Sequence, residues 1–229
     1  MKQDGFYVQL HMHTSETSGC GHATGAEMAA AAREAGYDLI VVTDHFMNAN
    51  IGCPKTLPWE EKVEYLSRGY RSAKAEGDRL GLRVLFGWET FNNGPEYLTY
   101  GLGEEFLLAN PDIADLGQYE YLDRVRRAGG FVIHAHPFRK ASYIPDFVPD
   151  PRSVEAFEVF NAGHKDPSFN DQARAMAKKF DLIMTAGSDA HATKDIVGGA
   201  MRFPYGINDM AELIAAIRRR DGEIVKKMK

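Results

Sequence analysis

Six of the eight histidines of this chain lie in short motifs that recur along the sequence, several of them next to acidic residues. The motifs are LHMH, VTDH, HAHP and SDAH, and a glutamate follows another apolar run in LFGWE. Together they supply His11, His13, His45, His134, His136, His191, Glu89 and Asp189. Zinc, manganese and iron accept both imidazole and carboxylate ligands, whereas magnesium and calcium sites are built mostly from oxygen. These residue types therefore predict a transition-metal site.

The number of candidate ligands predicts more than one ion. A single zinc takes about four ligands, and the motifs offer more than that. We therefore expect two or three divalent ions, of zinc, manganese or iron. Two ions about 3.5–4 Å apart can activate a hydroxide and neutralise a phosphoryl group during displacement. Three pairs are spaced two residues apart, which places both side chains on one face of an extended chain: His11 with His13, His134 with His136, and Asp189 with His191.

The elements that must position these residues follow a βα pattern, which favours a mainly parallel sheet. Strands are predicted near residues 7–11, 39–43, 84–88, 131–135, 156–160 and 182–186, with a further one near 200–203. Helices are predicted at about 25–36, 58–80, 118–128, 168–180 and 208–219. Segment 90–117 fits no repeat and is expected to hold an extra hairpin or loop. The pattern is compatible with a small barrel or with an open doubly wound sheet.

The motifs fall where the predicted strands end. In parallel α/β folds the carboxyl ends of the strands share one edge, and active sites form there. The histidines and acids of the motifs are therefore expected to meet at a single mouth. Asp44 precedes His45 and points the other way in an extended chain, so we expect it to orient a neighbouring histidine rather than to bind an ion.

Composition excludes several classes of protein. The chain has 229 residues and a formal charge of -5, so it lacks the basic surface of a general duplex-DNA binder. Its two cysteines cannot build a disulfide framework, and the first residues lack the apolar core of a signal peptide. No apolar stretch reaches the length of about 20 residues that crosses a bilayer. We expect a cytoplasmic protein with no membrane contact.

Five motifs in this order, LHMHT, VTDHF, GWE, HAHP and GSDAH, resemble the PHP (polymerase and histidinol phosphatase) family over about residues 6–200. The resemblance implies an α/β fold, a distorted seven-stranded (β/α) TIM-like barrel, as one domain over residues 1–229. It also implies a centre of two or three metal ions that hydrolyses phosphoesters.

The resemblance also implies a role for each matching residue. The first ion would be held by His11, His13, Glu89 and Asp189. The second would share Glu89 and add His136. The third would be held by His45 and His191.

The match departs from the family in two places. Members with three ions offer a further ligand shortly after the HxH motif, and here Glu16, Cys20 and His22 are all candidates. Such members also carry a histidine between the GxE and HP motifs, and none stands there in this chain. His134 is expected either to replace it or to hydrogen-bond a phosphate oxygen.

The expected reaction is hydrolysis of a small phosphomonoester, or of a short nucleotide phosphodiester, by a metal-activated hydroxide. Arg139 follows HAHPF and is placed to make a bidentate contact with phosphate. Asn161 and His164 follow another strand and are further candidates for substrate contact. A rim histidine or a second water would protonate the leaving group. The partner is thus a small phosphorylated substrate, with no stable nucleic-acid complex.

Two alternatives remain at this stage. Amidohydrolases also place HxH on the first strand of a barrel and hydrolyse C–N bonds, commonly with a carboxylated lysine on a strand. No lysine of this chain lies inside a predicted strand. The other alternative is a metal-stabilised module without catalytic activity.

Overall fold

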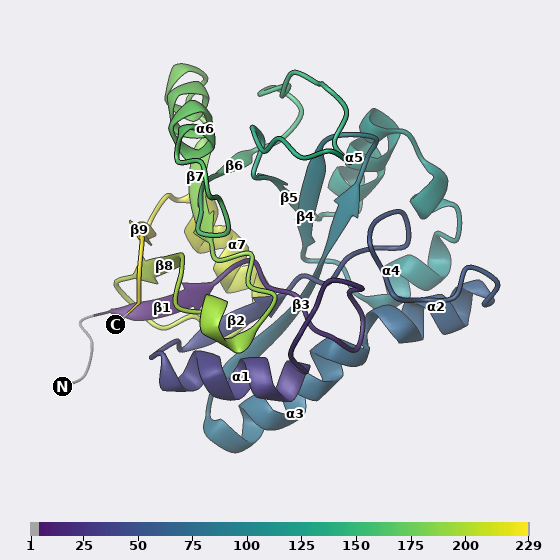
Figure 1. Cartoon of the computed structure of the whole chain (residues 1–229), viewed down its shortest axis with the longest axis horizontal. Coiled ribbons are helices and arrows are strands. Elements are labelled where there is room, and N and C mark those ends of the chain that lie inside the picture. The colour runs from purple at the N-terminus through teal and green to yellow at the C-terminus, as the bar shows by residue number, and fades with distance from the viewer. Residues whose placement is uncertain (1–4, 229) are drawn as a thin grey trace.

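The computed structural model describes residues 5–228, and its strands form one sheet (Figure 1). The strands are β1 (Phe6–Gln9), β2 (Leu39–Val42), β3 (Arg83–Phe91), β4 (Glu96–Tyr100), β5 (Phe131–Ala135), β6 (Ala156–Asn161), β7 (Ile183–Gly187), β8 (Ala200–Phe203) and β9 (Glu223–Val225). Their order across the sheet is β7-β6-β5-β4-β3-β2-β1-β8-β9. Each predicted strand is present, and β4 and β9 are additional.

The sheet curls until β7 approaches β1. Beyond β1 and β7, Met12 pairs with Ala190 in a parallel bridge, and the backbone N–H of His13 donates to the carbonyl of Ala190 at 2.8 Å. Strands β1 to β7 thus enclose a nearly closed barrel, which confirms the predicted α/β barrel class. The sheet has nine strands over residues 5–228 rather than seven, because β8 and β9 extend it beside β1.

The sheet is mixed, whereas we expected it to be mainly parallel. β1, β2 and β3 are parallel to one another, and so are β5, β6 and β7. β4 runs antiparallel to both β3 and β5, because a tight turn through Asn93 and Gly94, both with positive φ, returns the chain directly from β3. This β3–β4 hairpin is the extra element expected in segment 90–117.

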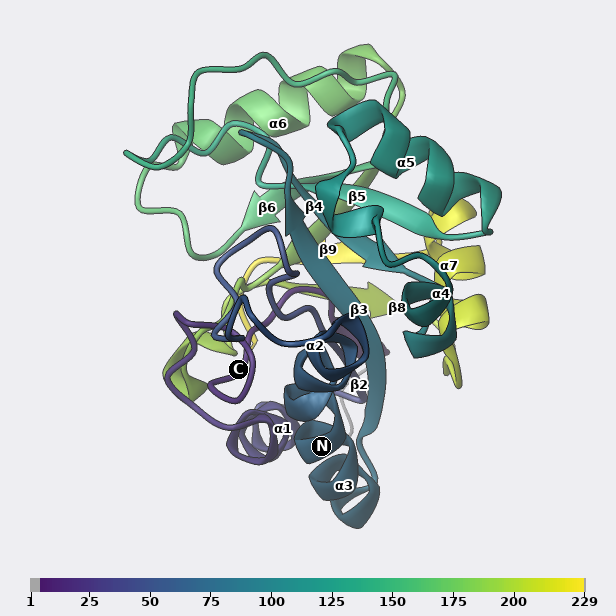
Figure 2. The ribbon, with the colours of Figure 1, turned by 90° about the vertical axis from the view of Figure 1, so that its right-hand side faces the viewer.

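Helices pack against the sheet. They are α1 (Gly25–Glu34), α2 (Trp59–Leu66), α3 (Arg68–Leu80), α4 (Glu104–Ala109), α5 (Gln118–Arg127), α6 (Ser168–Lys179) and α7 (Met210–Arg218), with short 3₁₀ turns at Ile113–Asp115 and Thr193–Asp195. Figure 2 shows α1 and α3 on one side of the molecule and α5 and α6 on the other. The apolar face of α7 packs with inward-facing strand residues such as Val8, Leu39 and Ile133 in the barrel core.

The single helix predicted over 58–80 is two helices that part at Ser67. At the break, the hydroxyl of Thr17, from a distant loop, lies between backbone groups of the two helices. It accepts from the backbone N–H of Gly69 at 3.2 Å and donates to the carbonyl of Tyr65 at 3.3 Å. These two backbone groups would bond each other in an unbroken helix. The inserted side chain therefore explains the break, and no local sequence signal reveals it.

The start of α1 is well specified. Thr24 and Glu27 form a reciprocal capping box at its first turn. Gly25 follows the cap and lies directly against the backbone of α3, where a Cβ would overlap the carbonyl oxygen of Gly69. The close crossing of α1 and α3 therefore requires glycine at this position.

Among the helices described over residues 5–228, none is both long enough and apolar enough to cross a membrane.

We predict that Gly25→Ala lowers the free energy of unfolding by about 1–3 kcal/mol, because the added methyl group forces α1 away from α3. Urea denaturation measures this change. Gly103→Ala is the matched control, since a Cβ at Gly103 meets no atom within 4 Å. Equal stability of the two variants would contradict this account of the helix crossing.

Candidate metal centre

The predicted ligands meet at the carboxyl edge of the barrel. His11 and His13 follow β1, His45 follows β2, and Glu89 lies within β3. His136 directly follows β5, and Asp189 and His191 follow β7. Each of these seven residues belongs to at least one of three groups whose donor atoms lie within 4.8 Å of one another: His11–His13–Asp189, His11–Glu89–His136 and His13–His45–His191. The predicted ligands thus lie close together at the ends of the strands.

The first group has the dimensions of a coordination shell. The Nε2 atoms of His11 and His13 are 3.3 Å apart. From these two atoms, Asp189 Oδ1 lies at 3.4 and 3.2 Å. Glu89 Oε1 lies 3.3 Å from His11 Nε2, and Glu89 Oε2 lies 3.5 Å from His13 Nε2. A tetrahedral ion with bonds of about 2.0–2.1 Å separates its ligand atoms by about 3.3–3.4 Å. The spacing of the His11, His13 and Asp189 donor atoms therefore fits three ligands of one divalent ion, with Glu89 beside them.

The second group centres on Glu89 and His136. His136 Nε2 is 3.0 Å from Glu89 Oε1, and Nδ1 of the same ring is 3.5 Å from Glu96 Oε2. Glu96 Oε2 and His164 Nε2 are buried atoms for which the structure of residues 5–228 gives no hydrogen-bond partner. Glu96 and His164 both flank His136. Neither was predicted as a ligand.

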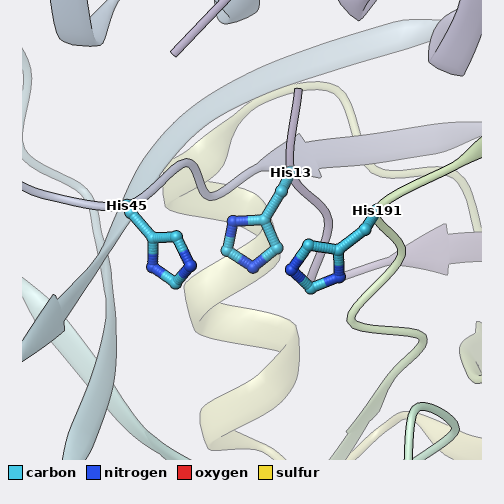
Figure 3. A group of neighbouring side chains, drawn as sticks. All are labelled: His13, His45 and His191. Atoms are coloured by element: carbon cyan, nitrogen blue, oxygen red, sulfur yellow. The ribbon is translucent and has the colours of Figure 1, made fainter. Parts of the chain in front are cut away.

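The third group consists of three imidazole rings in a row, with His13 in the middle (Figure 3). The ring centroids of His45 and His191 lie 4.4 and 4.5 Å from that of His13. Nδ1 of His191 donates to the carbonyl of Asp189 at 2.8 Å, which leaves its Nε2 free as a donor atom. The row therefore offers a further place for a cation.

Hydrogen bonds outside the cluster fix the orientation of its rings. His11 Nδ1 lies 3.0 Å from Glu158 Oε1, and the other oxygen of Glu158 accepts from the backbone N–H of His136. His13 Nδ1 lies 3.3 Å from the hydroxyl of Ser18, which in turn donates to Asp44. A partner on Nδ1 directs Nε2 of each ring into the cluster. Asp44 thus acts through Ser18, and sequence reasoning missed both Ser18 and Glu158.

Charge balance holds the buried carboxylates ionised. Burial alone would raise the pKa of Glu89, but neighbouring His11 and His136 hold it well below its usual range. Burial likewise opposes ionisation of Asp189, and Arg139 and His11 outweigh it, so its pKa is also low. For Glu96 the balance is reversed: burial together with the nearby Glu89 outweighs the opposing effect of His136 and Arg139 and raises its pKa to about 7. Glu89 and Asp189 are therefore ionised although they are buried, where a carboxyl group is normally neutral.

Two ligands stand in the left-handed backbone region. His136 has φ 31° and Asp189 has φ 52°, which side chains other than glycine rarely adopt. Such conformations cost about 1–3 kcal/mol and persist where the surrounding structure imposes them. His136 directly follows β5 and Asp189 lies two residues beyond β7, and each turn redirects the side chain into the mouth.

The turn at His136 overturns the expectation for His134. The two rings do not share a face: His134 is 1% exposed and packs outside the barrel among the rings of Tyr97, Phe147 and Phe157. It belongs to none of the three ligand groups and does not line the pocket at the cluster. The predicted roles of His134 as a ligand or phosphate contact are therefore wrong.

Arg139 lies where it was predicted. One of its terminal nitrogens donates to Asp189 Oδ2 and lies 3.3 Å from Asn161 Oδ1. Burial works against the charged form of Arg139, but the Asp189 carboxylate raises its pKa above the usual value. The side chain also lines a pocket of about 490 Å³ that opens onto the cluster. Arg139 thus orients Asp189 and faces the pocket at the same time.

The three candidates for an additional ligand, Glu16, Cys20 and His22, lie in different surroundings. Glu16 accepts two hydrogen bonds from the backbone N–H of Gly25 at the start of α1, and His22 is exposed. Cys20 lines the pocket and interacts with His45 and His191. Burial alone would raise the pKa of the Cys20 thiol, but these two imidazoles lower it to about 6.

Comparison with known proteins gives the same family as the motifs. A family model described as PHP-associated matches residues 167–221, the segment that carries Asp189 and His191. A two-domain protein of Bacteroides vulgatus, described as containing a predicted PHP-like metal-dependent phosphoesterase, has the same fold. Its TM-score is 0.72 at 14% identity, over 99% of this chain and 68% of that one. Residues 167–221 therefore match a PHP-associated family model, and the chain as a whole has the fold of PHP-like proteins.

Other proteins with this PHP fold have different described activities. A lesion-specific endonuclease of Pyrococcus furiosus matches at a TM-score of 0.65 and 13% identity, over 96% of this chain and 57% of that one. An amidohydrolase of Chromobacterium violaceum matches at a TM-score of 0.60 and 14% identity, over 96% of this chain and 97% of that one. At these identities the likeness concerns the fold.

A curated relative is more similar in sequence. An uncharacterized protein of Methanocaldococcus jannaschii is 34% identical over 124 residues, which is 51% of this chain and 50% of that protein. The matched stretch therefore spans half the length of this relative.

We predict that His134 affects acid stability. Burial and the nearby His136 lower its pKa to about 3, whereas an unfolded histidine titrates near 6.5. Between these values only the unfolded chain binds the proton, so this residue makes the protein less stable as the pH falls. In metal-free protein, His134→Phe should remove about 2 kcal/mol of the stability lost between pH 6.5 and 5.

Urea denaturation at several pH values measures the difference, and His22→Ala is the control because its side chain is exposed. Parallel pH profiles for the wild type and His134→Phe would refute the assignment.

Proposed function

We propose that this PHP domain is a metal-dependent phosphoesterase that hydrolyses a small phosphomonoester. The observation that carries the proposal is the first ligand group, in which the donor atoms of His11, His13 and Asp189 already have the spacing of a coordination shell. The other two groups adjoin it and share His11 and His13 with it. Clusters of two or three ions suit phosphoryl transfer because they can neutralise several oxygens at once.

Divalent ions, when bound, supply Lewis acidity towards phosphoryl oxygens and lower the pKa of water. The protein's own residues supply the orientation. Arg139 binds Asp189 Oδ2, so that Oδ1 of the same carboxylate faces His11 and His13. Its remaining guanidinium N–H groups can donate to a phosphate oxygen in the pocket. Glu89 presents both of its oxygens to surrounding imidazoles, which suits a carboxylate shared between ions.

The size of the pocket favours a small substrate. Its volume of about 490 Å³ falls within the range of small-molecule sites, about 300–1,000 Å³. The charged cluster forms one part of the wall, while Asn48, Asn50, Phe91 and Tyr143 contribute polar amides and aromatic rings elsewhere. A phosphate at the cluster would leave room for a compact organic group.

A short nucleotide phosphodiester is the second candidate substrate. The rings of Phe91 and Tyr143 lie 6.5 Å apart in the pocket wall, and aromatic side chains of this kind stack on nucleic-acid bases. The fold shared with a lesion-specific endonuclease agrees with this reading.

The alternative of C–N hydrolysis receives less support. No lysine lies in the strands described over residues 5–228, and none lines the pocket at the cluster. The carboxylated lysine expected for an amidohydrolase-type centre therefore has no candidate here, although the fold is shared with one such enzyme.

We predict that protein loaded with Zn²⁺ or Mn²⁺ hydrolyses an aryl phosphate, and that His11→Ala/His13→Ala reduces kcat/KM at least about 10³-fold. Such a loss corresponds to about 4 kcal/mol of transition-state stabilisation, which is within the range that metal ions supply. Steady-state kinetics with phosphomonoesters, short oligonucleotides and amides in parallel measures it and separates the three substrate classes.

The exposed histidine variant His22→Ala serves as the control and should keep full activity. Undiminished turnover by the double variant, or by protein stripped of metal, would contradict the proposal. A preference for the amide would support C–N hydrolysis instead.

A further inference from the structure

The side chain of Asn161 lies behind the candidate metal ligands, at the end of β6. Asn161 is 1% exposed and does not line the pocket of about 490 Å³ at the cluster. Its predicted contact with substrate is therefore not direct. Arg139 and Asp189 do line this pocket, and the Asn161 amide contacts both of them. Any effect of Asn161 on a bound phosphate must therefore pass through its neighbours.

The two ends of the Asn161 amide have different kinds of partner. The nitrogen donates to Glu158 Oε2 at 2.8 Å and to Asp189 Oδ2 at 3.4 Å. The oxygen accepts from a terminal nitrogen of Arg139 at 3.3 Å and from the backbone N–H of Gly163 at 2.9 Å. The donor end thus faces two carboxylates and the acceptor end faces two N–H groups. A carboxylate at this position would serve only the second end.

The backbone of Asn161 is fixed by a side chain of α6. Asn170 accepts from the Asn161 backbone N–H at 3.0 Å and donates to the Asn161 carbonyl at 3.1 Å. The following loop passes closely over the amide, since a Cβ on Gly163 would lie 3.1 Å from Asn161 Oδ1 and 3.6 Å from Asp189 Oδ2. These contacts hold the amide against the cluster in one place.

The amide also connects Arg139 to the candidate metal ligands. Glu158, to which Asn161 donates, lies 3.0 Å from His11 Nδ1. Asp189 is itself a candidate ligand, and its Oδ2 accepts from both Arg139 and Asn161. Because hydrogen bonds of this kind orient both partners, the direction of the Arg139 guanidinium depends on the same carboxylates that orient the ligands.

We propose that Asn161 is a positioning residue for phosphate binding, because its amide holds Arg139 with the remaining guanidinium N–H groups towards the pocket. This inference rests on the proposed phosphoesterase function and deepens it. Without Asn161 Oδ1, the guanidinium keeps its bond to Asp189 but loses the second acceptor that fixes its rotation. Binding a phosphate must then also order the Arg139 side chain, which costs conformational entropy and weakens binding.

A double-mutant cycle on phosphate binding tests the proposal without relying on turnover. Wild type, Asn161→Ala, Arg139→Ala and the double variant are loaded with Zn²⁺, freed of excess metal and titrated with inorganic phosphate by calorimetry. Asn161→Ala should raise the Kd for phosphate about 10-fold, and Arg139→Ala at least as much. The double variant should bind no more than about twofold more weakly than Arg139→Ala, because Asn161 acts through Arg139. Zinc content and circular dichroism establish that each variant is loaded and folded.

A nearly isosteric variant tests the two-sided role of the amide. Asn161→Asp keeps an oxygen for Arg139 but places a second oxygen against Glu158 and Asp189. At about pH 8 the new carboxyl group is ionised and repels both carboxylates. This variant should therefore bind phosphate as weakly as Asn161→Ala. Wild-type affinity in Asn161→Asp would overturn the role of the amide.

The matched control is Asn208→Ala, which should bind phosphate as the wild type does. Asn208 is exposed and lies at the other edge of the barrel, where it accepts from Arg83 at the start of β3 at 3.0 Å.

The outcomes separate this inference from the function on which it rests. Independent, additive losses in the double variant would overturn the role of Asn161 alone, because its effect would then not pass through Arg139. Loss of zinc from Asn161→Ala would overturn it as well, since Asn161 would then support the metal ligands instead. A wild type that holds zinc but binds no phosphate would contradict the proposed function, and this inference with it. A wild type that holds no zinc would contradict the metal centre itself.

Discussion

The burial of Glu89 is the constraint on which the rest of this structure depends. The residue is 1% exposed, and its carboxylate lies within 3.5 Å of nitrogens from four histidines, on segments that follow β1, β2 and β5. Removing a carboxylate from water costs several kcal/mol unless nearby positive or polar groups compensate. Histidines supply positive charge only when protonated, whereas divalent ions would supply it over the whole physiological range of pH. The cluster is therefore most coherent as a metal-binding site.

Closure of the barrel brings together Glu89 and the other candidate metal ligands. His11 and Asp189 are far apart in the sequence, and they meet because the chain beyond β1 pairs with the chain beyond β7. Glu158 reinforces the same arrangement, since it contacts His11 on one side and the backbone of His136 on the other. The relative positions of the candidate ligands thus depend on the curvature of the whole sheet. A change in barrel packing would therefore alter the distances between their donor atoms.

The sequence predicted the location of the site better than its details. Strand-end placement predicted that the seven ligand candidates converge, because that rule depends only on strand direction. The expected alternation ends at His136, where a left-handed backbone turn directs His136 into the mouth while His134, inside β5, stays on the opposite face. The break at Ser67 depends on Thr17, which is distant in sequence. Glu158 lies inside an apolar strand, and only the barrel interior that it faces makes it a partner of His11.

Anomalous diffraction from crystals grown with Zn²⁺ tests the central claim most directly. The account predicts a strong zinc peak enclosed by His11, His13, Glu89 and Asp189, with the four side chains close to their present positions. Further peaks should adjoin His136 and the row of His45 and His191. Crystals with zinc in the solution but no anomalous peak within this cluster would contradict the account.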